Sequence, residues 1–305
     1  MKRVLSVILC IAATAGALML SGCFQFISSL SDYSSYPALW IVEDQDGHRC
    51  YLFGTNNTGK DDTLFPLPDV IEDAYSYCSA VASECDLTEE QDGAPATYTD
   101  GTTIKDHLSE RVYNAAVSFI TAKEGEYDEK YDKYTAAEWY SMIERYSLKT
   151  YGYSTEYGTD RYILNKAKTD GKKIYELEGA SRQSELVGSV SDEVYEYFII
   201  STLNNRGSTS YDYYDQLYRT GEMRALERAV EGSRNAVYPD AALKAKMDEY
   251  YSIMLVGRNK AMAEEVLKYL SDGERVFVAV ASSHIVGTDG IAEILRSNGC
   301  KIIRK

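Results

Sequence analysis

The sequence predicts an α/β fold: a single domain with a central sheet, an N-terminal β-hairpin and a large helical middle section. Five consecutive apolar residues, 276–280, are typical of a strand that is buried on both faces. Two apolar runs flank Asp46-Gly47, a dipeptide that favours a tight hairpin turn. Between about residues 97 and 251, charged positions alternate with apolar and tyrosine positions at helical spacing. With 305 residues, 45% of them hydrophobic, the chain can bury a full core.

The N-terminus has the pattern of a secretory signal peptide. Lys2 and Arg3 precede an uncharged apolar run at 4–20. Leu20-Ser-Gly-Cys23 then resembles a bacterial lipobox, in which the cysteine receives the lipid. An ordinary cleaved signal and an uncleaved helical anchor are the alternatives.

Lipidation at Cys23 predicts an extracytoplasmic protein that is anchored to a bacterial membrane. Stable anchoring takes more than one acyl chain, which a lipoprotein cysteine provides. The expected organisation is a lipoprotein signal peptide at 1–22, a tether at 23–36 and a folded domain at 37–305.

The net charge makes nucleic acid an unsuitable partner. The formal charge is -15, and removal of 1–22 takes away Lys2 and Arg3 but no acid, which gives -17. Phosphate binding needs a basic face, and the basic residues do not cluster into one. Four cysteines remain after Cys23, and they predict either two disulfides in any of three pairings or free buried thiols: Cys50, Cys78, Cys85 and Cys300.

In the first half of the domain, two predicted strands end in polar residues. The second hairpin strand runs into the loop 54–59, whose glycines and polar side chains are typical of functional loops. A helix is expected at 67–74, with Pro68 in its first turn. A strand at 79–83 then ends at Glu84, whose carboxylate is a candidate ligand or base, or else a solvated strand-end acid.

The helical middle contains one further strand. A helix is predicted to start near Gly158, with Thr159 or Asp160 as its N-cap. The strand at 172–177 ends at Glu178, which is either a second acid of the site or part of a structural salt bridge. The many tyrosines of this section favour packing between amphipathic helices over a ligand-stacking surface.

The last part of the chain brings a basic residue and a histidine to the same region. A helix at 258–270 opens with Arg258, which we expect to pair with Glu84 or Glu178; binding an anionic group is the alternative. The strand at 276–280 delivers His284 to its C-terminal end, where open α/β sheets keep their sites. A short helix at 291–297 and a strand at 301–303 complete the domain.

An ordered series of segments resembles the TraB/GumN family, which is related to the Tiki metalloproteases. The series covers the chain from Pro37 to the C-terminus: Trp40 with its hairpin, Tyr51-Leu-Phe-Gly-Thr, the strand that closes on Glu84, Gly158-Thr-Asp-Arg161, Leu177-Glu178, Tyr218-Arg-Thr-Gly221, Arg258-Asn259, and Val278 through His284 to Gly290. The resemblance implies a single α/β domain and a divalent metal near two Gly-x-x-His motifs and a glutamate.

This chain departs from that pattern at one ligand. The first motif is Gly54-Thr-Asn-Asn57, so asparagine stands where the family has histidine. The second is Ala281-Ser-Ser-His284, which keeps the histidine, and Glu84 matches the glutamate. An asparagine offers only a neutral carbonyl oxygen, so binding of Mn, Co or Zn is expected to be weakened or absent. The candidate metal ligands are His284, Glu84 and Asn57, and the candidate catalytic residues are Glu84, Glu178 and Arg258.

Two functions follow from the resemblance. The favoured one is a degenerate relative, a pseudoenzyme, that binds a peptide or another extracellular ligand. The alternative is a divalent-metal-dependent hydrolase, a peptidase with an altered metal site. The sequence contains no nucleophile elbow, phosphate loop, dinucleotide fingerprint or His-Glu-x-x-His motif that would favour another reaction class.

Overall fold

The computed structural model describes residues 36–86, 94–204 and 209–305. The expected signal peptide, Cys23 and all of the tether except Tyr36 lie outside the described residues. Within the described ranges, no helix combines the length and apolar character needed to cross a membrane.

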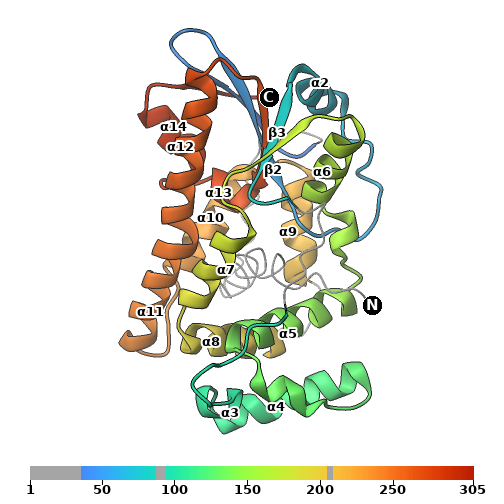
Figure 1. The fold of residues 1–305 in the computed structure, drawn as a ribbon, viewed down its shortest axis with the longest axis vertical. Helices are drawn as coiled ribbons and strands as arrows, with labels where there is room; N and C mark the ends of the chain where they lie inside the picture. The colour runs from blue at the N-terminus through green and yellow to red at the C-terminus, as the bar shows by residue number, and fades with distance from the viewer. Residues whose placement is uncertain (1–35, 87–93, 205–208) are drawn as a thin grey trace.

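A six-stranded sheet forms the centre of the domain, in the order β4-β3-β5-β2-β1-β6 (Figure 1). The strands are β1 (Leu39–Glu43), β2 (Arg49–Thr55), β3 (Ala80–Ser83), β4 (Lys173–Glu176), β5 (Val276–Ala281) and β6 (Lys301–Arg304). Strands β2 to β5 run parallel, whereas β1 is antiparallel to both of its neighbours, β2 and β6. The α/β fold and the N-terminal hairpin predicted from the sequence are therefore confirmed.

Both faces of the sheet are buried, which explains the unbroken apolar run of β5. Val276, Val278 and Val280 belong to the larger core cluster, while Phe277 and Ala279 belong to a second cluster on the opposite face. Side chains alternate between the faces because successive residues of a strand point in opposite directions. A parallel strand covered on both sides therefore needs no polar positions.

Helices cover the two faces in different ways (Figure 1). Helices α2 (Asp69–Tyr77) and α6 (Thr159–Thr169) contribute apolar residues to the second cluster. Helices α12 (Arg258–Ser271) and α14 (Ile291–Ser297) contribute to the larger one. The sheet thus forms the middle layer between these two pairs.

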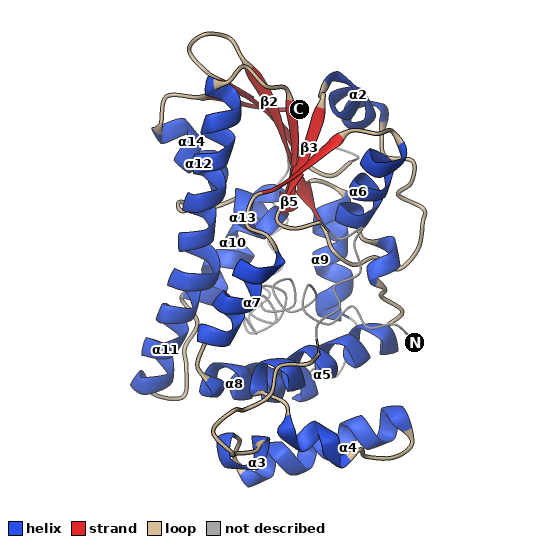
Figure 2. Cartoon of the chain, in the orientation of Figure 1, coloured by secondary structure: helices blue, strands red, loops and turns tan. Residues whose placement is uncertain are grey.

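The helical section extends beyond the sheet, and Figure 2 shows its helices in blue below the strands. Its α-helices are α3 (Ile104–His107), α4 (Glu110–Glu124), α5 (Ala136–Thr150), α7 (Ala180–Ser189), α8 (Asp192–Asn204), α9 (Thr209–Arg219), α10 (Met223–Arg234) and α11 (Ala241–Tyr251). Short 3-10 turns lie at η1 (Glu129–Lys133) and η2 (Thr155–Tyr157). A π-helical turn, η3 (Ser252–Gly257), joins α11 to α12 without a break.

Tyrosines of this section pack into the core, as predicted. Tyr140, Tyr195 and Tyr250 are buried in the larger cluster, and their rings contact Phe198. Glu144 of α5 is fully buried in the same cluster of helices. A lone buried carboxyl is costly when charged, and burial raises the pKa of Glu144 to about 8.

Two local predictions about helix starts are wrong, and the structure decides between the two alternatives for the cysteines. Helix α2 begins at Asp69, two residues later than expected, because Pro68 is its extended N-cap rather than a first-turn residue. The N-cap of α6 is Gly158, not Thr159 or Asp160. Among the described residues, the cysteines are buried and form no disulfide with one another: Cys50, Cys78, Cys85 and Cys300.

Candidate functional site

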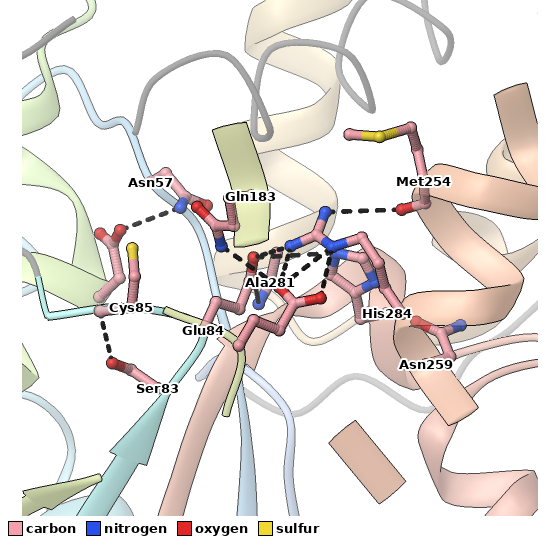
Figure 3. Close-up of polar contacts among 12 residues, drawn as sticks. Asn57, Ser83, Glu84, Cys85, Gln183, Met254, Asn259, Ala281 and His284 are labelled. Atoms are coloured by element: carbon pink, nitrogen blue, oxygen red, sulfur yellow. Dashed lines mark hydrogen bonds and ion pairs between the residues drawn. The ribbon is translucent and has the colours of Figure 1, made fainter. Parts of the chain in front are cut away.

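The C-terminal ends of the four parallel strands meet at one edge of the sheet and carry the polar residues singled out in the sequence. Asn57 follows β2, Glu84 follows β3, Glu178 follows β4, and His284 lies in the short helix α13 (Ser282–Ile285) after β5. Figure 3 shows Glu84 and His284 within one network of polar contacts, with Asn57 to one side. Parallel strands bring these residues together because their carboxyl ends share an edge.

Arg258 lies at the centre of this network. It is the first residue of α12, directly after the π-helical turn, and is only 2% exposed. Its Nη2 donates to Glu84 Oε2 at 2.7 Å and to Glu178 Oε2 at 2.6 Å, and its Nε donates to Glu178 Oε1 at 2.8 Å. The predicted ion pair is therefore confirmed, and it joins Arg258 to both acids.

Every carboxylate oxygen of the two glutamates already accepts a hydrogen bond. Glu84 Oε1 accepts a hydrogen bond from the backbone N–H of Ala281 at 2.9 Å. Glu178 also accepts from Gln183 Nε2 at 3.3 Å. With two carboxylates and one guanidinium, the cluster has a formal charge of minus one if both glutamates are ionised.

His284 is neutral, and its tautomer follows from one neighbour. Asn259 Nδ2 donates to the carbonyl of Asp289 at 2.8 Å, which leaves Asn259 Oδ1 as the acceptor for His284 Nδ1 at 2.6 Å. The proton is thus assigned to Nδ1, so Nε2 carries a lone pair. Full burial, reinforced by the positive charge of Arg258, lowers the pKa of His284 to about 3. The sequence analysis did not assign this orienting role to Asn259.

Asn57 is hydrogen-bonded to the first turn of α6. Its Nδ2 donates to Asp160 Oδ2 at 2.9 Å, and the neighbouring backbone is fixed by Thr159 N donating to Asn56 O at 2.8 Å. Gly158 permits this approach, because a Cβ there would lie 2.6 Å from Asn57 O. The contact between the β2 loop and α6 thus determines where the Asn57 amide points.

Asp160 is a buried acid in the first turn of α6 and is not the N-cap of that helix. Burial, reinforced by the charge of Glu84, raises the pKa of Asp160 to about 7. Its Oδ1 has no hydrogen-bond partner in the described part of the chain. One sequence signal was available: a helix that precedes a parallel strand starts at the site edge of the sheet, so first-turn residues of α6 belong to that edge.

The three expected metal donors form a weak set of ligands. His284 Nε2 lies 3.9 Å from Glu84 Oε2, so these two side chains are neighbours. Glu84 Oε2, however, already accepts from Arg258, and Asn57 offers only the neutral oxygen of an amide whose Nδ2 donates to Asp160. One imidazole, one carboxylate shared with Arg258 and one neutral amide oxygen are a weaker set than the three protein ligands of a catalytic zinc site. The residues present do not fit a firmly held transition metal.

A different group of possible ligands lies on the hairpin turn. Among the described residues, Asp44, Asp46 and His48 are the group of histidine, cysteine and acidic side chains whose ligand atoms all lie within 4.8 Å of one another. Asp44 already accepts hydrogen bonds from the backbone of Asp46 and His48, as in ordinary polar turns. This exposed cluster is unconnected with the predicted site residues.

Comparison with known proteins agrees with the ordered resemblance. The model of the TraB/PrgY/gumN family matches residues 38–304, which is nearly the whole domain. No curated protein and no solved structure matches the chain. From the extent of that one match, this chain belongs to the TraB/PrgY/gumN family.

Proposed function

We propose that this family member is a lipid-anchored, extracytoplasmic protein that binds a peptide at the C-terminal edge of its sheet without hydrolysing it through a metal. The observation that carries the proposal is the environment of Asn57. The residue at this position offers a neutral amide oxygen in place of an imidazole, and its Nδ2 donates a hydrogen bond to Asp160.

The charge network supports the same conclusion. Arg258 satisfies Glu84 and Glu178 with hydrogen bonds of 2.6 to 2.8 Å. A buried charge is stable only when it is paired or coordinates a metal, and here the pairing comes from within the chain. The site therefore does not require a metal to hold its acids together.

The alternative function is a divalent-metal-dependent peptidase with an altered site. One observation favours it: His284 is neutral, and Asn259 holds its Nδ1–H, so Nε2 has the lone pair that a metal would need. Glu84 is the carboxylate next to that nitrogen.

Calorimetric titration of residues 24–305 with Mn, Co and Zn separates the two functions. The proposed function predicts no metal binding beyond that of the His284→Ala and Glu84→Ala variants. Stoichiometric micromolar binding that both substitutions abolish would establish the hydrolase alternative instead. The Asn57→His variant serves as a positive control for the titration, because it adds the missing imidazole donor.

A further inference from the structure

The guanidinium of Arg161 makes no hydrogen bond or ion pair with the part of the chain that the structure describes. Its Nε is shielded from solvent. A buried N–H without an acceptor costs free energy, so an arginine serving only as solvated surface would not keep its Nε in this position.

The location of Arg161 is fixed by the topology. It lies in the first turn of α6, which leads into the parallel strand β4. A helix that connects parallel strands runs opposite to them, so this turn lies at the edge where the strands end. The contacts of Thr159 with Asn56 and of Asp160 with Asn57 fasten the turn to the candidate site.

The electrostatics of this turn favour an anionic ligand group at Arg161. Arg258, the other arginine of the site, is already fully engaged with Glu84 and Glu178. Arg161 is close enough for its charge to favour the ionised form of Asp160, yet the two residues form no ion pair. The N-terminal end of the 11-residue helix adds a partial positive charge to the same place.

We propose that Arg161 binds a carboxylate of the peptide ligand. This inference rests on the proposed function and names the group through which that ligand is recognised. A guanidinium binds a carboxylate with two parallel hydrogen bonds, and a lysine in its place supplies charge but not that geometry. The carboxylate is either the C-terminus of the peptide or an acidic side chain, and both sources have the same chemistry.

The test uses full-length protein in detergent and three pools of N-acetylated random hexapeptides. The first pool has a free C-terminal carboxylate and no Asp or Glu, the second has a C-terminal amide and no Asp or Glu, and the third has a C-terminal amide but includes Asp and Glu. Peptides retained by the immobilised protein are quantified by mass spectrometry. Retention of the first or third pool about tenfold above the second is expected, which is the scale of one charge-assisted contact.

Substitutions then test whether Arg161 causes the preference for peptides with a carboxylate. Arg161→Gln is expected to lower retention to the level of the second pool, and Arg161→Lys to an intermediate level. Arg296→Gln is the matched control, because it removes the same charge from an exposed arginine of α14. Should Arg161→Gln lose its folded circular dichroism signal, Arg161→Lys decides, since it keeps the charge and must still lower retention several-fold.

The outcomes distinguish this inference from the proposed function. Equal retention of all three pools by the wild type, unchanged in Arg161→Gln, overturns the role of Arg161 but leaves peptide binding intact. Retention of no pool overturns peptide binding and the inference with it. A preference for the first pool identifies the C-terminus as the source of the carboxylate, and a preference for the third identifies an acidic side chain.

Discussion

The buried ionisable side chains of this domain differ in how the cost of burying a charge is offset. The charge of buried Arg258 is balanced by two carboxylates, whereas buried His284 is neutral. Glu144 forms no ion pair with any described residue and keeps its proton instead. The stability of the fold is therefore expected to respond differently to mutation and pH at these three residues.

Removing Arg258 leaves two buried acids without their counter-ion. We expect Arg258→Ala to lower the free energy of unfolding by about 3 to 5 kcal/mol, as is usual when one partner of a buried ion pair is deleted. Urea denaturation followed by circular dichroism measures this. Arg296→Ala, in an exposed pair with Glu293, should change it by less than about 1 kcal/mol. Similar values for the two variants would show that the Arg258 network does not stabilise the fold.

Glu144 makes stability fall as pH rises. Its pKa is about 8 in the folded protein and near 4.5 when unfolded, so between these values the folded state holds a proton that the unfolded chain releases. At pH 9 we expect Glu144→Gln to be more stable than wild type by on the order of a few kcal/mol, with little difference near pH 4. Urea unfolding at both pH values measures this.

The matched control for that experiment is Glu249→Gln, which neutralises an exposed acid of α11. Its stability difference from wild type should be nearly independent of pH. If the Glu144→Gln and wild-type curves remain parallel from pH 4 to pH 9, the buried carboxyl is not protonated in the fold.

Secondary-structure elements pack closely against each other at glycines, because glycine has no side chain to separate them. At Gly158 a Cβ would lie 2.5 Å from Asp160 Oδ1 and 2.6 Å from Asn57 O, so the β2 loop and α6 can approach only at a glycine. Gly54 is comparable, since a Cβ there would lie 2.5 Å from Ser282 Oγ. The position of Asn57 is therefore a property of two element contacts rather than of its own side chain.

Gly158→Ala is expected to destabilise the domain by about 1 to 3 kcal/mol, because the added methyl forces these elements apart. Gly188→Ala in α7 is the matched control: a Cβ there meets nothing within 4 Å, and alanine is the better helix former, so stability should rise by about 0.5 to 1 kcal/mol. Thermal unfolding of the two variants compares them. Equal effects would mean that the α6 contact is loose enough to accept a side chain.

Elements with strong local patterns were predictable from the sequence. The run at 276–280 and the Asp46-Gly47 turn identified β5 and the hairpin, and parallel pairing then brought Glu84, Glu178 and His284 to one edge. Asp160 and Arg161 were not recognised, because which side of a first helical turn faces a neighbouring loop depends on tertiary packing. The π-helical turn before Arg258 was also missed, since hydrophobic spacing does not reveal a single inserted residue.

At the scale of the whole molecule, the proposed lipid anchor at Cys23 can be tested by its effect on where the protein is found. We expect Cys23→Ser to move the protein from the membrane fraction to a soluble fraction or to leave an unprocessed precursor, because the residue proposed to carry the lipid is lost. Cell fractionation and intact-mass measurement of the purified chain test this. Cys300→Ser is the control, since that thiol is buried in the domain. An unlipidated wild-type chain would contradict the lipoprotein assignment.

The path from α11 through η3 to α12 runs from the helical section to the sheet (Figure 1). A π-helical turn contains one residue more than the regular helix, and one residue corresponds to about 100° of rotation about the axis. The turn therefore sets the phase between the two halves, so that α11 presents Met247 to the helices while α12 presents Arg258 to Glu84. A deletion of one codon within Ser252–Gly257 would reset that phase and carry the guanidinium away from its acids without altering any side chain of the site.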